Sequence, residues 1–159
     1  MADRGFKGVL RPLCLGVIAC VLIIGLVGAK ATGDACEVCH CERQPLTVDC
    51  SNRGLTELPI GIPNDTAKLD LSMNFLREIP EDWLLQFDYL VYLSVSGNLI
   101  SNSFKVPPSL RSLSAYDNQL QDIRMMMETG KLWKVSFARN KLEVIRTDTF
   151  RNCNELAKV

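Results

Sequence analysis

The stretch that decides the fold is LDLSMNFL at residues 69–76, in which leucines alternate with polar residues and an asparagine follows. The same arrangement returns around three further asparagines, at intervals of 24, 20 and 22 residues. The aligned asparagines are Asn74, Asn98, Asn118 and Asn140, and the apolar residues two positions after them are Leu76, Ile100, Leu120 and Leu142. Four matches in register predict a tandem structural repeat.

The chemistry of these positions explains why they recur. An apolar residue at every second position predicts a short strand with one buried face, here Leu69 and Leu71, Leu93 and Val95, Leu113 and Ala115, and Val135 and Phe137. One repeat cannot bury that face alone, so neighbouring repeats must stack into a parallel sheet over a shared core. An inward asparagine has two N–H donors and an acceptor for the backbone groups left at each turn. We therefore expect the four asparagines to form a ladder.

The second half of each repeat should form the opposite wall of the core. Ile79, Leu84, Phe87 and Leu90 follow Leu76 at the offsets at which Ile145, Phe150, Cys153 and Leu156 follow Leu142. These residues should line turns or short helical segments. The second repeat, with Pro107-Pro108, is too short for a helix there and should be extended. The run Met125-Met126-Met127 should fill the core, the alternative being an adaptable binding surface.

The N-terminus has the pattern of a secretory signal. Arg4, Lys7 and Arg11 precede an apolar run at 13–29, and Ala29-Lys30-Ala31 offers a small-x-small cleavage site. An uncleaved signal anchor is the alternative, because the run just reaches the length of the shortest membrane spans. Both interpretations send residues 32–159 into the secretory pathway.

The cysteines fit that route. Cys36, Cys39, Cys41 and Cys50 cluster, which implies two disulfides with three possible connectivities in an oxidising compartment. Zinc bound by these thiols and His40 is the alternative. Cys153 lies at an inward position, where it should pack as a small hydrophobic residue; a bond to another chain or segment is the alternative.

On these motifs, residues 36–159 resemble the extracellular leucine-rich-repeat proteins, and the stretch from Cys36 to Pro59 is similar to that family's N-terminal cap. The resemblance implies the disulfides Cys36–Cys41 and Cys39–Cys50. It also implies an α/β-type solenoid: a right-handed superhelix with a parallel concave sheet, an irregular or short-helical convex side and a stapled cap. Thr66 and Ala115 depart from the pattern, because Thr66 replaces a leucine and Ala115 underfills its strand.

The predicted organisation has three parts. They are a signal peptide or anchor at 1–31, a cysteine-rich cap at 32–65, and repeats at 66–89, 90–109, 110–131 and 132–155 with the start of a fifth at 156–159. Beyond residue 31 the chain has 14 Lys and Arg against 17 Asp and Glu, a balance that argues against binding nucleic acid. His40 is the sole histidine, and no phosphate-binding glycine loop or carboxylate pair is recognisable, so we expect neither catalysis nor a cofactor.

The predicted function is extracellular protein recognition, as a receptor-like or adhesion module. The expected binding residues project from the concave sheet and are Lys68, Asp70, Tyr92, Arg111, Tyr116, Asp117, Trp133, Lys134 and Arg139. A column of small polar residues, Asp70, Ser94, Ser114 and Ser136, should let a partner approach closely. The partner would be an extracellular protein ligand or receptor, and a membrane only if the N-terminal segment stays uncleaved. The alternative is a matrix component that self-associates through its C-terminal end.

One modification site is also predicted. Asn64-Asp65-Thr66 is the sole Asn-x-Ser/Thr sequon, on the loop before the first repeat strand. In the secretory pathway, Asn64 would be a glycosylation site; an unmodified turn is the alternative.

Overall fold

The computed structural model describes residues 34–44, 46–127, 131–146 and 148–158. The predicted signal segment at 1–31 lies outside these residues. The elements follow one another as the helical turn α2 (Ala35–Val38), the strands β1 (His40–Arg43), β2 (Leu46–Asp49) and β3 (Lys68–Asp70), the 3-10 turn η1 (Trp83–Gln86), β4 (Tyr92–Ser94), β5 (Ser112–Ser114), the 3-10 turn η2 (Arg124–Met127) and β6 (Lys134–Ser136). Among the described residues, no helix has the length and apolar character needed to cross a bilayer.

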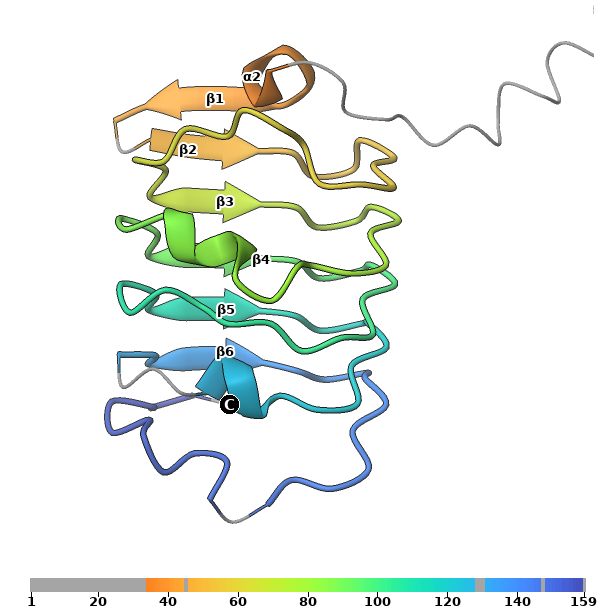
Figure 1. The fold of residues 1–159 in the computed structure, drawn as a ribbon, viewed down its shortest axis with the longest axis vertical. Coiled ribbons are helices and arrows are strands. Elements are labelled where there is room, and N and C mark those ends of the chain that lie inside the picture. The colour runs from red at the N-terminus through yellow and green to blue at the C-terminus, as the bar shows by residue number, and fades with distance from the viewer. Residues whose placement is uncertain (1–33, 45, 128–130, 147, 159) are drawn as a thin grey trace, which may run out of the picture.

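The six strands form one sheet in chain order, stacked along the long axis of the molecule (Figure 1). β1 and β2 make an antiparallel hairpin, and every later neighbour is parallel. Leu69 of β3 pairs with Leu93 of β4, which pairs with Leu113 of β5. The predicted parallel solenoid is therefore confirmed, and each coil places the same position above that of the next.

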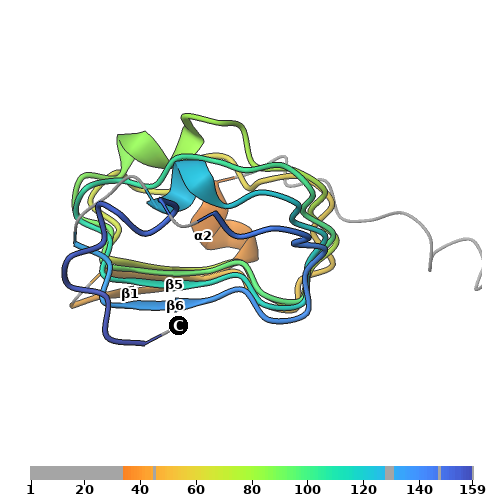
Figure 2. The same ribbon diagram turned by 90° about the horizontal axis from the view of Figure 1, so that it is seen from below.

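The core lies between the sheet and the opposite wall, which Figure 2 shows on the two sides of the coil. The inward residues of the strands are buried as predicted: Leu71, Val95 and Ala115 are fully covered and Phe137 is nearly so. The two residues that depart from the repeat pattern are both accommodated in the interior. Ala115 is fully buried, and Thr66 is buried with its hydroxyl donating to the carbonyl of Pro63 at 2.6 Å.

The predicted asparagine ladder is present. Asn98 Oδ1 accepts from the amide of Leu76 at 3.0 Å, and Asn98 Nδ2 donates to the carbonyls of Leu71 and Val95 at 2.9 and 3.0 Å. Asn74, Asn118 and Asn140 repeat this arrangement one coil away. Each amide thus satisfies buried backbone groups of two coils at once, and these groups would otherwise be costly to bury.

The cap closes the first end of the stack. Disulfides join Cys36 to Cys41 and Cys39 to Cys50, the two pairs that the resemblance implied. With all four thiols so bonded, none is a thiolate available to zinc, and the described residues contain no group of three or more metal-ligating side chains. The hairpin covers the edge of β3 that would otherwise be open.

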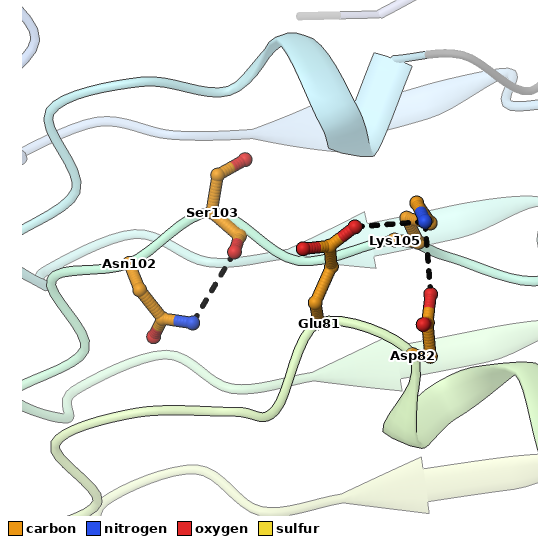
Figure 3. A network of polar contacts seen from close by, with 5 residues as sticks. All are labelled: Glu81, Asp82, Asn102, Ser103 and Lys105. Atoms are coloured by element: carbon orange, nitrogen blue, oxygen red, sulfur yellow. Dashed lines mark hydrogen bonds and ion pairs between the residues drawn. The ribbon is translucent and has the colours of Figure 1, made fainter.

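The wall opposite the sheet changes from coil to coil. The first coil carries η1 and the third carries η2, in which Met126 and Met127 are buried, as expected of core-filling methionines. The second coil has no helix at this point, as its length predicted. Instead, Asn102 exchanges two hydrogen bonds with the backbone of Ile79. Lys105 Nζ lies 2.7 Å from a carboxylate oxygen of Glu81 and 3.0 Å from one of Asp82 (Figure 3).

One predicted core residue is not in the core. Ile145 is 53% exposed, whereas the equivalent Ile79 of the first coil is fully buried. Leu142, Phe150 and Leu156 are only partly buried, although Cys153 is covered and its thiol donates to the carbonyl of Met127 at 3.3 Å. The prediction for Ile145 was wrong because a residue at this offset is buried only where a complete coil lies on each side of its own. Beyond the fourth coil, the described chain adds only one bridge, between Lys134 and Lys158.

Candidate functional site

The outward side of the sheet, which we call the sheet face, presents regular columns of side chains. Because β3 to β6 pair without offset, one column is Lys68, Tyr92, Ser112 and Lys134 and the next is Asp70, Ser94, Ser114 and Ser136. A third position follows two residues later in each coil, at Ser72, Ser96, Tyr116 and Ala138. At each position of the sheet face, neighbouring coils therefore differ only in the side chain that they present.

The centre of the sheet face is a floor of small residues. Ser94 is only 5% exposed, so the serine of the second coil offers little surface of its own. Ser96 is buried too, and its hydroxyl lies 2.8 Å from that of Ser114. Ser114 and Ser136 remain half-buried. The buried serines of the second coil therefore lie below the exposed side chains around them.

Three aromatic residues stand at the margins of this floor. Tyr92, Tyr116 and Trp133 are each between 36% and 43% exposed, and they come from three consecutive coils. Tyr92 and Trp133 lie where the chain enters the sheet, whereas Tyr116 lies where it leaves. Exposed aromatic rings bury much area at a low cost in side-chain entropy, which makes them frequent anchors of protein interfaces.

The charged candidates differ in their availability. Lys68, Lys134 and Arg139 are exposed. Arg111, in contrast, already binds Glu155 through Nη1 at 2.9 Å. Asp70 accepts a hydrogen bond from the amide of Ser72 at 2.8 Å and so stabilises its own turn. A partner of Arg111 or Asp70 would have to share or replace these contacts.

Asp117 and Arg139 have a structural role that the sequence did not reveal. The residue just before each ladder asparagine has a left-handed backbone: φ is 57° at Met73, 66° at Gly97, 56° at Asp117 and 57° at Arg139. Non-glycine residues adopt this conformation infrequently, so the turn after each strand imposes it. Both side chains are exposed and project from these turns at the margin of the sheet face.

Met73 projects from the sheet but is not among the binding residues that the sequence predicted. It is 58% exposed, and its Sδ lies where a side chain at Gly97 would be, 2.6 Å from a β-carbon built there. The glycine therefore makes room for the methionine at the margin opposite Tyr92. The available signal was the single glycine among four residues that precede a ladder asparagine.

Burial and hydrogen bonding shift the pKa values of a few titratable groups. The pKa of Asp49, which pairs in register with Asp70, is lowered by hydrogen bonds from the side chain and then the backbone of Ser51. Burial raises the pKa of the Cys153 thiol. Cys153 is buried, and Asp49 is half-buried on the cap strand β2, outside the predicted binding residues, so we connect both shifts with stability.

Comparison with known proteins identifies the scaffold. The family described as "Leucine rich repeat N-terminal domain" matches residues 35–63, which contain both disulfides. The chain is a leucine-rich-repeat protein. Its repeats are similar to those of leucine-rich repeat-containing protein 3 of Danio rerio, with 36% identity over 127 residues, which is 75% of this chain and 48% of that protein.

Two further relatives of this leucine-rich-repeat protein are much longer. Leucine-rich repeat-containing G-protein coupled receptor 4 of Bos taurus is 39% identical over 57% of this chain and 10% of its own length. Leucine-rich repeat and immunoglobulin-like domain-containing nogo receptor-interacting protein 1 of Xenopus tropicalis is 32% identical over 57% of this chain and 15% of its own. The chain thus spans about half of the first relative and a small part of the others.

Proposed function

We propose that this leucine-rich-repeat protein is an extracellular recognition module that binds a protein partner through its sheet face. Its relatives include a receptor and a protein whose name describes it as receptor-interacting, which supports a protein-binding role in general. The two disulfides support an oxidising location, extracellular or at the membrane surface. The partner would accordingly be an extracellular ligand or the extracellular part of a receptor.

The observation that carries this proposal is the combination of a recessed serine floor with three exposed aromatic margins. A partner that lies over Ser94 and Ser114 approaches the backbone of the sheet and meets Tyr92, Tyr116 and Trp133 around it. Lys68, Lys134 and Arg139 then surround these anchors with charge, which favours association more than it adds affinity. No catalytic step is part of this proposal.

Photo-crosslinking on living cells tests the proposal even though the partner is unidentified. A benzophenone amino acid replaces Trp133 or Tyr116 in the full-length chain, and Leu85, exposed on the opposite wall, is the matched control position. We expect crosslinked protein adducts from Trp133 and Tyr116 and none from Leu85. Equal adducts from Leu85 would remove the sheet face from consideration.

The identified partner then allows a quantitative test. Replacing Tyr92, Tyr116 and Trp133 together by alanine should weaken binding at least about 100-fold, because anchors of this kind contribute roughly 1–2 kcal/mol or more each. The control replaces Leu85 and Val144, which are exposed but lie off the sheet face. Both variants should keep the circular dichroism of the wild type, and undiminished binding by the folded triple variant would contradict the proposal.

Self-association is the second candidate function. The edge of β6 accepts the next strand, because the amide of Val135 donates to the carbonyl of Lys158 at 2.9 Å. Val144 and Ile145 are exposed further along the same coil. The mass of the purified chain by light scattering over a 100-fold dilution separates the two functions. A monomer throughout supports recognition, whereas assembly that weakens when Ile145 becomes lysine supports the structural role.

A further inference from the structure

The turns that lead into the strands form a second regular column, apart from the sheet face. Four of them are closed by the same hydrogen bond, from the amide of the last residue to the carbonyl of the first, at 3.0–3.2 Å. They are 63–66, 87–90, 107–110 and 153–156. In Figure 1 the loops that enter β3, β4 and β5 lie one above another along one edge of the sheet.

The first two of these turns bring Asn64 and Tyr89 to adjacent coils at neighbouring turn positions. Because Lys68 pairs with Tyr92, Asn64 occupies the turn position of Asp88, and Asp65 occupies that of Tyr89. Adjacent strands lie about 4.8 Å apart, so the two turns are direct neighbours. Asn64 is exposed, and Tyr89 is 69% exposed, the most of any aromatic side chain in the described part of the chain.

We propose that Asn64 carries an N-linked oligosaccharide whose first sugar packs against the ring of Tyr89. The inference rests on the secretory location given under the proposed function. The sequon Asn64-Asp65-Thr66 supplies the acceptor, and the turn presents it to solvent. Tyr89 supplies an apolar surface at the height of one coil, against which the C–H face of a sugar ring can pack.

The chemistry is a glycosyl transfer from a lipid-linked oligosaccharide diphosphate. The amide nitrogen of Asn64 forms a bond to the anomeric carbon of the first sugar while the bond from that carbon to the diphosphate oxygen breaks. The diphosphate leaves with the electron pair, and the amide loses one proton. No oxidation or reduction takes place.

The structure also fixes when this transfer must occur. Thr66, the hydroxyl residue of the sequon, is fully buried and donates to the carbonyl of Pro63 at 2.6 Å. A transferase that recognises this hydroxyl cannot reach it in the folded coil. Transfer therefore precedes closure of the 63–66 turn, after which Thr66 takes up its structural role.

The position of the glycan is compatible with recognition. Asn64 lies in the leading turn, four residues before the column that begins with Lys68, and the floor at Ser94 and Ser114 is one and two coils further on. An oligosaccharide there shields the cap end of this edge, and it leaves the serine floor open. Glycosylation thus uses the turns that lead into the first two repeat strands, and partner binding uses the sheet beyond them.

The test uses the full chain secreted from animal cells. Intact mass is measured before and after an amidase that releases N-linked glycans and converts the asparagine to aspartate. We expect the wild type, Thr66→Ser and Tyr89→Ala to carry a glycan on residue 64 and Asn64→Gln to lack it. Secreted protein with both disulfides formed but an unmodified Asn64 overturns the glycan inference and leaves the proposed location intact. Retained protein with reduced cysteines contradicts both.

The contact with Tyr89 is tested by thermal unfolding of the same samples. Enzymatic removal of the glycan should lower the Tm of the wild type by roughly 2–4 °C, the shift expected for a contact of about 1 kcal/mol in a domain of this size. The same treatment should change Tyr89→Ala by less than half as much, while Tyr116→Ala, an exposed tyrosine of the third coil, should behave as the wild type. Equal losses in the wild type and Tyr89→Ala overturn the contact.

Discussion

The first and fourth coils have the same pattern of apolar residues but do not bury it equally. In the first coil, Leu76, Ile79 and Leu84 are fully covered. In the fourth, Leu142 is partly buried and Ile145 is 53% exposed. The first coil lies between the cap and the second coil, whereas the fourth has a complete neighbour on one side only. The pattern therefore sets which way a side chain points, and the neighbours determine how much of it is buried.

The contacts on the wall opposite the sheet show what a second neighbour adds. Asn102 of the second coil donates to the carbonyl of Ile79 at 2.7 Å and accepts from its amide at 3.2 Å. Figure 3 shows Lys105 reaching back from the same segment to Glu81 and Asp82. Both salt bridges raise the pKa of Lys105, so it stays charged over the physiological range. These contacts hold the first and second coils together on the wall opposite the sheet.

The largest effect on stability is expected from a matched pair of alanine variants. Ile79→Ala should destabilise the chain by about 2–5 kcal/mol, because it removes a fully buried side chain from a site that cannot close. Ile145→Ala removes the same atoms from a half-exposed site and should change the free energy of unfolding by about 1 kcal/mol or less. Chemical denaturation of the two variants measures both values.

The same two variants can also contradict the conclusion that the fourth coil is less covered than the first. A loss for Ile145→Ala as large as that for Ile79→Ala would mean that the fourth coil is covered in solution, by another segment or another molecule. In that case the loss should depend on protein concentration if the covering molecule is a second copy.

The ladder gives a test of intermediate size. Asn74→Ala should destabilise by about 2–4 kcal/mol, because it leaves the amide of Leu55 and the carbonyls of Cys50 and Leu71 buried without their partner. Asn140→Ala should cost roughly half as much, since Asn140 is only half-buried and water can reach the groups it leaves. Equal losses in denaturant titrations would show that position along the ladder does not matter.

The smallest expected effect concerns pH at the cap end of the sheet. Hydrogen bonds from Ser51 hold the pKa of Asp49 below 3.8, so its folded pKa lies under its unfolded value. The stabilisation is therefore complete above about pH 4 and is lost as pH falls through the folded pKa. Asp49→Asn should remove about 0.5 kcal/mol or less of this acid sensitivity, measured by denaturation from pH 7 to pH 2.

Asp122 is the internal comparison for that measurement. Its pKa is also lowered, chiefly by the hydrogen bond from Arg124, so acid sensitivity should persist in Asp49→Asn. A variant with no remaining acid dependence would contradict this assignment.

The sheet side was predictable from the sequence because each coil repeats the same physical demand. Leu71 and Asn98 are where a period of two and a buried polar turn require them, and the stack supplies their neighbours. The extended wall of the second coil followed from its length and its prolines. These features depend on residues within one coil and its repetition, which the sequence contains.

The missed features depend on contacts between coils. Ser94 is buried in the sheet, Arg111 is held by Glu155 from the end of the fourth repeat, and Met73 uses space that Gly97 leaves open. None of these follows from alternation or from asparagine spacing, because each sets a side chain against a residue of a different coil. Of the predicted binding residues, the three aromatic ones are 36–43% exposed.

The direction of the hydrogen bonds in the sheet has a mechanical consequence. They run along the long axis, from the cap towards the start of the fifth repeat (Figure 1). Tension along this axis therefore loads one strand pair at a time, and the described coils should separate one after another. Each released coil of 20–24 residues would add roughly 70–85 Å of length, until the covalent loop at Cys39–Cys50 stops the extension.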